Sequence, residues 1–71
     1  MTNTVRLKET INQRGVSITF IANTIGITRE GLYNKLNGET EFKGSEIAKI
    51  SKILRLTNKE RDDIFFSDNV N

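Results

Sequence analysis

The chain has 71 residues and contains no cysteine, no histidine and no proline. Without cysteine it can form neither a disulfide nor a thiolate metal site, and without histidine it lacks the usual zinc ligand sets and histidine-based acid–base catalysis. No pair of acidic residues stands out from an ordinary solvated surface, and no glycine-rich nucleotide loop is present. The sequence therefore argues against an enzyme and implies no cofactor.

Long hydrophobic runs are also missing, since the longest apolar stretches span only a few residues. A transmembrane helix needs about 20 apolar residues, and the core of a signal peptide needs about 7–15. We therefore expect a cytoplasmic protein without membrane contact. At this length we expect one domain, residues 1–71, which buries only about 60% of its unfolded surface and so has a thin core.

The two signs of charge nearly balance, but they are unevenly distributed along the chain. The net charge is +2. Residues 1–38 carry five basic and two acidic side chains, whereas residues 39–71 carry six basic and seven acidic ones. A basic N-terminal half favours a phosphate-bearing partner, although an excess of this size is also compatible with ordinary solvated helix faces.

The stretch SITFIANTIGITREGLYNKLNG, residues 17–38, is the most informative part of the chain. Ser17 and Thr28 are good N-caps, and Gly26 supplies the left-handed residue that ends a helix. Ala22 is small where two helices would have to cross closely. The pattern predicts two short helices, 18–25 and 29–36, folded as a helix-turn-helix whose second helix enters a DNA major groove.

Three further helices complete an all-α prediction. Gly15 ends a first helix in the C′ manner, and Thr57 with Glu60 forms a T-x-x-E capping box. The dipeptide Asn37 and Gly38 could form a hairpin turn, but the flanking segments lack period-two alternation, which favours a helix end instead. The predicted helices are 4–14, 18–25, 29–36, 44–54 and 58–66, with a frayed polar tail from about residue 67.

Helical spacing also predicts which side chains turn inward. We expect Phe42, the one large apolar residue of its loop, to fold back into the core. Phe66 should stay at or near the surface, because three consecutive apolar residues cannot all point inward from one helix. The other expected core residues are Leu7, Ile11, Phe20, Ile21, Ile25, Leu32, Leu36, Ile47, Ile50, Leu54, Ile64 and Phe65.

The residues now described resemble a known family. The order of Ala22, Gly26, the Ile-Thr-Arg that follows it and Leu32 is similar to the lambda-repressor/Cro type of helix-turn-helix, also called the XRE family. The segment KLNGETEFKGSEIAKISKILRLTNKERDDIFF looks like the short Cro-like repressors of phages and prophages in Gram-positive bacteria. The likeness covers residues 4–66. It implies a five-helix DNA-binding domain that represses transcription by occupying an operator.

The chain departs from this family at two places. Many members have glutamine where Ile18 stands, and that glutamine supports contacts to the DNA backbone. Many also pair an arginine on the first helix with a glutamate at the end of the third, at positions that match Ile11 and Leu36. Replacing a buried ion pair by apolar residues can be neutral or stabilising. We therefore expect Ile11 and Leu36 to touch.

Polar side chains on the helix 29–36 are candidates for reading bases. Arginine can donate two hydrogen bonds to guanine, asparagine can pair with adenine, and a glutamate can accept from cytosine. Gly31 offers no side chain and would let the backbone approach DNA closely, or is simply tolerated. The alternative is a solvated helix face. The candidate base-reading residues are Arg29, Glu30, Tyr33 and Asn34.

Phosphate contacts are expected at the edges of the motif. The backbone amides at the start of the helix 18–25 form an anion site, and Asn37 with Lys43 resembles a second phosphate clamp of the family. For each basic residue, a role in solubility alone is the alternative. The candidate phosphate-binding residues are Arg14, Ser17, Ile18, Thr19, Thr28, Lys35, Asn37 and Lys43.

The expected partner is double-stranded operator DNA, bound by a homodimer to which an exposed Phe66 would contribute. Phe66 could instead only cover the edge of the core. A different class of function also fits the modest charge and Glu30. In it the domain is a protein-binding module that modulates another phage regulator, as an antirepressor would.

Overall fold

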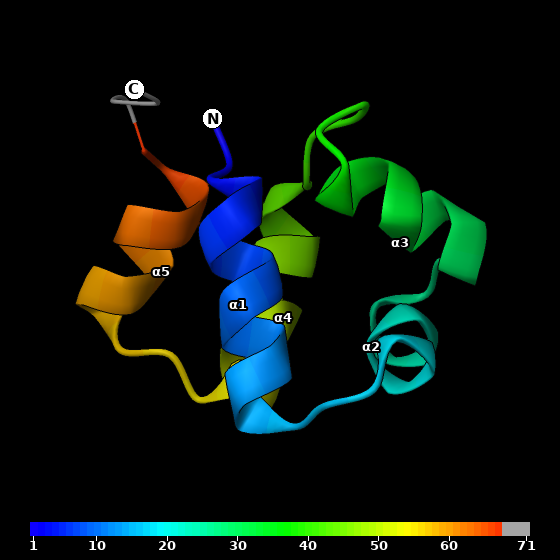
Figure 1. The fold of residues 1–71 in the computed structure, drawn as a ribbon, viewed down its shortest axis with the longest axis horizontal. Coiled ribbons are helices and arrows are strands. Elements are labelled where there is room, and N and C mark those ends of the chain that lie inside the picture. Colours follow the sequence, from blue (N-terminus) through cyan, green and yellow to red (C-terminus); the bar gives the residue numbers. More distant parts are fainter. Residues whose placement is uncertain (68–71) are drawn as a thin grey trace.

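Five α-helices and their short connections form the structure, a computed structural model that describes residues 1–67 (Figure 1). The all-α prediction is confirmed, and the first four helices have the predicted bounds. The fifth ends one residue early, because Phe66 leaves the helical conformation with a φ of −121° and acts as its C-cap. The helices are α1 (Thr4–Arg14), α2 (Ile18–Ile25), α3 (Arg29–Leu36), α4 (Gly44–Leu54) and α5 (Asn58–Phe65).

Local capping explains where the helices begin. In four of them a side-chain oxygen of the preceding residue accepts a hydrogen bond from a backbone N–H in the first turn, a contact worth about 1 kcal/mol. At α4 the arrangement is reversed, because the buried Glu46 carboxylate accepts from the backbone N–H of Lys43 at 2.8 Å. The four capping residues are Asn3, Ser17, Thr28 and Thr57.

Left-handed residues end three of the helices. Gly15 and Gly26, with φ values of 69° and 81°, follow α1 and α2 as predicted. The end of α4 is different, because Arg55 adopts the same conformation with a φ of 57° although it carries a side chain. Within residues 1–67 it is the one non-glycine residue with a positive φ.

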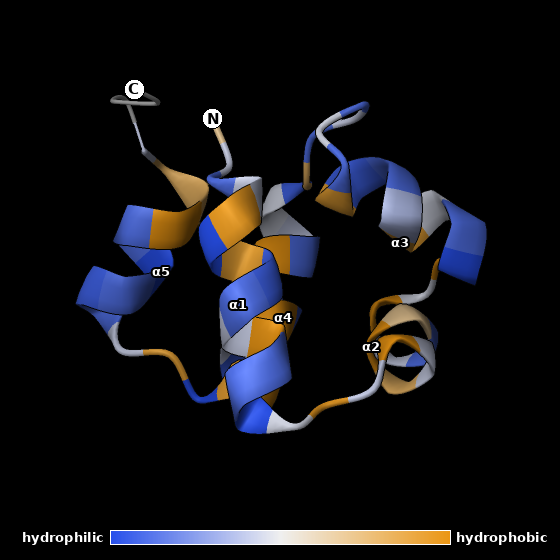
Figure 2. Cartoon of the chain, viewed as in Figure 1, coloured by the Kyte–Doolittle hydropathy of each residue, from blue (hydrophilic) through white to orange (hydrophobic). Residues whose placement is uncertain are grey.

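The helices surround one apolar core. In Figure 1, α1 and α4 lie side by side in the middle, with α5 on one side and the pair α2 and α3 on the other. Hydrophilic residues cover most of the outer faces of α1, α3 and α5 (Figure 2). The buried core consists of Leu7, Ile11, Ile21, Ala22, Ile25, Leu32, Leu36, Phe42, Ile47, Ile50, Leu54, Ile64 and Phe65.

Phe42 and Phe66 lie as predicted. Phe42 is 8% exposed and reaches from the loop before α4 to meet the Phe65 ring edge-to-face, with ring centroids 5.5 Å apart. Phe66 is 54% exposed. The structure has no helix within residues 1–67 with the length and apolar character needed to cross a bilayer. The predicted fraying falls mostly on residues 68–71, outside the described residues.

The prediction for Phe20 was wrong. It was expected in the core, yet it is 55% exposed. The buried residues of α2 are Ile21, Ala22 and Ile25, and Ile18 packs partly against them. With about 100° between successive residues, Phe20 points to the side opposite this stripe. Its size suggested burial, but its helical position decided against it.

Candidate nucleic-acid interface

The turn between α2 and α3 gives the candidate site its shape. The backbone N–H groups of Gly26 and Ile27 both donate to the carbonyl of Ala22, at 2.9 and 3.0 Å, which closes α2 and redirects the chain. Thr28 then caps α3 by accepting from the Gly31 N–H at 2.9 Å. These contacts produce the predicted helix-turn-helix.

The outward face of α3 carries the four predicted base-reading residues. Arg29 and Glu30 are exposed, Tyr33 is 43% exposed, and Asn34 is half-buried. The opposite face is fixed in the core by two fully or nearly fully buried residues, Leu32 and Leu36. Helical spacing placed Glu30 and Asn34 outward, Tyr33 on the flank and Arg29 nearer the inner side; in the structure Arg29, Glu30 and Tyr33 are exposed, and Asn34 is partly covered. Base contacts by these residues stay a prediction.

The absence of a side chain at Gly31 leaves room for the N-cap of α3. A Cβ built at this position would lie 3.2 Å from the Oγ1 atom of Thr28, the hydroxyl that caps α3. That distance is tighter than an ordinary van der Waals contact, so a side chain would press on the cap. The cap therefore gives a reason for the glycine within the fold, and the close approach of DNA stays a prediction.

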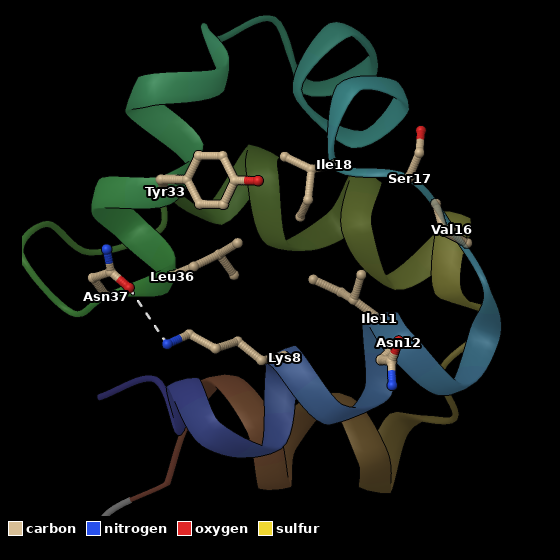
Figure 3. Close-up of a pocket in the computed structure, with 9 residues that line it drawn as sticks. All are labelled: Lys8, Ile11, Asn12, Val16, Ser17, Ile18, Tyr33, Leu36 and Asn37. Carbon is tan, nitrogen blue, oxygen red and sulfur yellow. Dashed lines mark hydrogen bonds between the residues drawn. The ribbon is translucent and has the colours of Figure 1, made fainter.

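A groove of about 500 Å³ runs between α1 and α3 and past the start of α2 (Figure 3). It brings together two residues predicted at the start of α2, Ser17 and Ile18, and two predicted on or just after α3, Tyr33 and Asn37. The nine residues that line it are Lys8, Ile11, Asn12, Val16, Ser17, Ile18, Tyr33, Leu36 and Asn37.

The apolar floor of this groove contains two positions, Ile11 and Leu36, at which the chain departs from the family that it resembles. Ile11 and Leu36 belong to the same buried cluster, and their side chains point toward one another in Figure 3. This placement agrees with the expectation that apolar residues replace a polar pair here. Ile18 lies partly buried against the same cluster, so it offers its backbone rather than a polar side chain.

The sequence interpretation missed a polar contact at the groove's rim. The ammonium of Lys8 on α1 donates to the Oδ1 atom of Asn37 at 3.4 Å, across 29 positions of sequence (Figure 3). The first helix was interpreted only for its apolar spacing. Because Lys8 precedes the buried Ile11 by three positions, it lies on the side of α1 that faces α3, which could have been a signal.

Lys35, a predicted phosphate contact, has partners inside the domain. Its ammonium lies 3.2 Å from the Glu46 carboxylate and donates to the carbonyl of Glu41 at 2.9 Å. It also lies 5.7 Å from the centre of the Phe42 ring. Its side chain is 12% exposed. Lys35 therefore ties α3 to the loop and to α4, which leaves little of it available to DNA.

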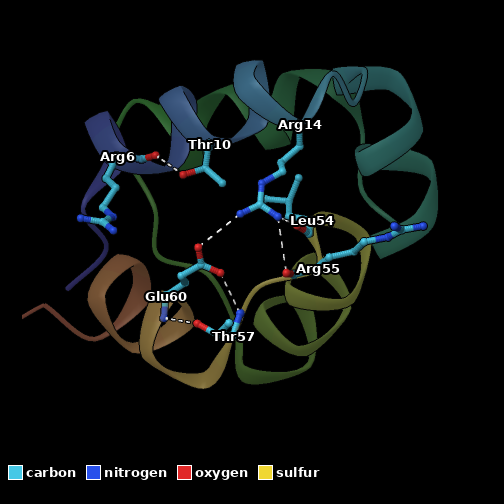
Figure 4. Close-up of polar contacts among 7 residues, drawn as sticks. All are labelled: Arg6, Thr10, Arg14, Leu54, Arg55, Thr57 and Glu60. Carbon is cyan, nitrogen blue, oxygen red and sulfur yellow. Dashed lines mark hydrogen bonds and ion pairs between the residues drawn. The ribbon is translucent and has the colours of Figure 1, made fainter.

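Arg14 also turns to another part of the fold (Figure 4). Its guanidinium donates to the carbonyl of Leu54 at 2.8 Å and, at 3.5 Å, to that of Arg55. It also pairs with the carboxylate of Glu60 at 3.2 Å. Arg14 thus braces α1 against the connection between α4 and α5.

The backbone N–H of Thr57, with Arg14 as a further positive neighbour, lowers the pKa of Glu60 below its ordinary value. The carboxylate of Glu60 accepts that N–H at 2.8 Å, and its own N–H donates to the Thr57 hydroxyl at 3.1 Å. The predicted capping box at the start of α5 is therefore confirmed, and the ionised form of Glu60 is the one that the fold stabilises.

Other predicted phosphate contacts are accessible. Ser17, Thr19, Thr28 and Lys43 are all exposed. Among residues 1–67, neither Lys43 nor Arg29 forms an ion pair with a carboxylate. Both cations are therefore free of internal neutralisation, one at the start of α3 and one just before α4.

Comparison with known protein families finds a match to the Cro/C1-type HTH DNA-binding domain over residues 6–60. The matched region takes in α1 from Arg6 onward, all of α2, α3 and α4, and the start of α5, and so includes both walls of the groove and the whole outward face of α3. Comparisons with curated proteins and with solved structures found no match. Because the family model covers more than half of the chain, this protein belongs to the Cro/C1-type helix-turn-helix DNA-binding family.

Proposed function

We propose that this domain is a sequence-specific transcriptional regulator, a phage or prophage repressor of the Cro-like kind. It inserts α3 into the major groove of an operator and represses by occupying the promoter. The observation that carries the proposal is the polar outward face of α3, whose inward face is fixed by Leu32 and Leu36. A helix held rigidly at its back and polar at its front suits base recognition.

The side chains on this face match the chemistry of base edges. Arg29 can donate two hydrogen bonds to guanine, and Asn34 can bond both the N6 and N7 atoms of adenine. Glu30 can accept from the amino group of cytosine, and Tyr33 can contact a thymine methyl or a phosphate. Each good base contact is worth about 1–3 kcal/mol of discrimination.

Backbone contacts then set the position of α3 in the groove. The backbone N–H groups of residues 17–19 lie at the N-terminal end of α2, where the helix dipole favours an anion. Asn37 follows α3, and Lys43 precedes α4 across a short loop. Contacts on both flanks of α3 would fix its register without specifying sequence.

A selection from random DNA tests the proposal without knowledge of the operator. Duplexes with a random central segment are bound to the protein at low salt, recovered and sequenced through several rounds. We expect one motif to be enriched, and a two-fold symmetric motif would show binding as a dimer. The recovered duplex should bind at least about a thousandfold more tightly than a scrambled one.

The control is a variant that changes the face of α3 but not its anchors. Arg29→Ala combined with Asn34→Ala should keep the helical circular dichroism spectrum and lose the selected preference. Enrichment of no motif by the wild-type protein, with no binding to any duplex at low salt, would exclude a DNA-binding regulator.

Two surface features favour a second function, binding to another protein. Phe20 is 55% exposed on α2, and Glu30 brings a negative charge to the α3 face. Both features suit a protein partner better than a phosphate backbone. In this alternative the domain modulates another phage regulator as an antirepressor. A failed DNA selection combined with loss of another regulator's DNA binding on addition of this protein would favour it.

A further inference from the structure

Lys8 on α1 and Asn37 just after α3 lie at the rim of the groove, and each has N–H groups that can donate to a ligand. A lysine ammonium can only donate hydrogen bonds, so the atom of Asn37 that faces it must be the Oδ1 oxygen. Their separation is 3.4 Å. The Nδ2 group of Asn37 is then directed away from Lys8, as Figure 3 shows. Two of the three ammonium protons and both amide protons are left to donate to something outside the domain.

The charge of Lys8 is not neutralised within the fold. Of the nine residues that line the groove, Lys8 is the only one with a charged side chain. No carboxylate among residues 1–67 forms an ion pair with it. Lys35 and Arg14, by contrast, have carboxylate partners in Glu46 and Glu60. The rim of the groove therefore offers a free positive charge beside an oriented amide.

The groove borders the outward face of α3 on its α1 side. Tyr33 and Asn37 line it from the α3 side, and Ser17, at the start of α2, lines it from the other direction (Figure 3). A helix in a major groove has a sugar–phosphate backbone along its flanks. One backbone segment would thus pass along this rim, where its phosphates meet donors from three separate parts of the chain.

We propose that Lys8 is a DNA-backbone contact, and that it also orients Asn37 to donate to the same strand. The inference rests on the proposed function, because it names a further residue of the same DNA-binding surface. It assigns to Lys8 a part in DNA binding that the sequence pattern did not predict. The ligand is a phosphodiester of duplex DNA, so the contact should act on all sequences alike.

Lys8 can be replaced without loss of the fold. It is exposed, and its contact with Asn37 is long and solvent-accessible, so it contributes little to stability. Lys8→Met keeps the aliphatic stem and the helix propensity while removing the charge. Lys8→Arg keeps the charge. Lys52→Met is a matched control, because Lys52 is an exposed lysine in the last turn of α4 and pairs with no carboxylate in the described part of the chain, residues 1–67.

The experiment measures binding to a fluorescein-labelled duplex by anisotropy between about 50 and 300 mM salt, a range in which phosphate contacts dominate the salt dependence. The duplex is the one recovered from the selection, with a scrambled duplex beside it. For Lys8→Met we expect the slope of log K against log salt to become shallower by about 0.9 per bound protomer. At 0.1 M salt the corresponding loss is about eightfold per protomer, on both duplexes.

The control variants decide the interpretation. Lys8→Arg should restore the slope, and Lys52→Met should bind like the wild type. Equal slopes for Lys8→Met and the wild type would overturn the proposal, whatever their affinities. So would an equal effect of Lys52→Met, because this would show a general effect of net charge. Failure of the wild-type protein to bind any duplex would instead remove the proposed function itself.

Discussion

Two arginines occupy helix ends at which arginine lowers stability, one because of its charge and one because of its backbone conformation. Arg29 is in the first turn of α3, where the helix dipole disfavours a cation by about 0.3–1 kcal/mol, and no carboxylate among residues 1–67 forms an ion pair with it. Arg55 holds a left-handed conformation that glycine adopts more readily. The fold explains neither choice by stability, but a DNA partner would explain Arg29.

Arg29→Ala should therefore reduce base discrimination without reducing stability. We expect the preference at one base pair of the selected duplex to fall by about 1–3 kcal/mol, because a pair of hydrogen bonds to a base edge is lost. Urea unfolding should show unchanged or slightly increased stability. Competition binding with each base substituted in turn measures the effect. An equal loss of affinity on all duplexes would show that Arg29 contacts phosphate instead.

Arg55→Gly should stabilise the domain. Removing Cβ relieves the strain of the positive φ, and part of that gain is offset by the greater freedom of glycine in the unfolded chain. We expect a net gain of about 0.5–1 kcal/mol in the free energy of unfolding. Arg55→Ala is the control, since it removes the same side chain but keeps Cβ. If alanine stabilised as much as glycine, the backbone explanation would be wrong.

At the scale of elements, the connection from α3 to α4 depends on Lys35. It joins the Glu46 carboxylate, the Glu41 carbonyl and the Phe42 ring, and it is largely removed from water. The same Glu46 carboxylate accepts a hydrogen bond from the backbone N–H of Lys43, the residue that precedes α4. The position of α4 relative to α3 is therefore held by a small polar cluster around one lysine.

Lys35→Met should destabilise the domain by about 1–2 kcal/mol, because it leaves Glu46 with a largely buried and unpaired charge. Its salt dependence of DNA binding should match the wild type. Combining it with Glu46→Gln should cost less than the sum of the two single changes. Urea unfolding and anisotropy titrations measure both quantities. A shallower salt slope with unchanged stability would restore Lys35 as a phosphate contact.

The start of α5 should make stability sensitive to acid. The pKa of Glu60 is lowered by the Thr57 N–H and by Arg14, so ionised Glu60 stabilises the fold above its unfolded pKa of about 4.5. This contribution is lost as the pH falls through the lower pKa of the folded state. Asp63 has a pKa lowered by the Lys59 ammonium, and it adds to the same trend.

Glu60→Gln tests this account. Glutamine still accepts the Thr57 N–H but cannot titrate, so the variant should be less stable at neutral pH. Its stability should then fall less between pH 5 and 3 than that of the wild type, a range chosen around the ordinary carboxyl pKa of about 4. Thermal unfolding at a series of pH values measures both curves. Parallel curves would show that Glu60 has no part in the acid response.

At the scale of the whole molecule, we propose that the domain binds DNA as a dimer. The domain measures 29 × 24 × 21 Å. Each of these extents is smaller than the ~34 Å that separates successive major grooves on one face of DNA, so two copies fit on neighbouring half-sites without overlapping. Phe66, at the end of α5, is 54% exposed. The proposed dimer would use it as an interface residue.

Phe66→Ser should weaken self-association by about tenfold or more, as expected for an aromatic at the centre of an interface. The fold should stay intact, because Phe66 lies outside the core. Phe20→Ser is the matched control, since the two rings are 54% and 55% exposed. Sedimentation equilibrium at micromolar concentration compares them. A wild-type protein that stays monomeric both alone and on the selected duplex would exclude the dimer.

The sequence alone determined the helices, because their signals are local. Caps such as Ser17 and Thr57 act on the next three residues, and Gly15 and Gly26 take their left-handed conformation without help from distant residues. Helical spacing also determined which side of α3 is buried and therefore which polar side chains are presented outward. The same spacing, applied to α2, would have excluded Phe20 from the core.

Only the tertiary structure decided how the charged residues are used. Arg14 and Glu60 are 46 positions apart, Lys8 and Asn37 are 29 apart, and Lys35 meets Glu46 only after the chain has turned through a loop. Long flexible side chains pair with whichever elements the core packing brings near, and the spacing of residues in the sequence does not indicate which elements these are. The fold thus directs Arg14 and Lys35 to internal carboxylates, whereas Lys8, beside α3, forms an ion pair with no carboxylate among residues 1–67.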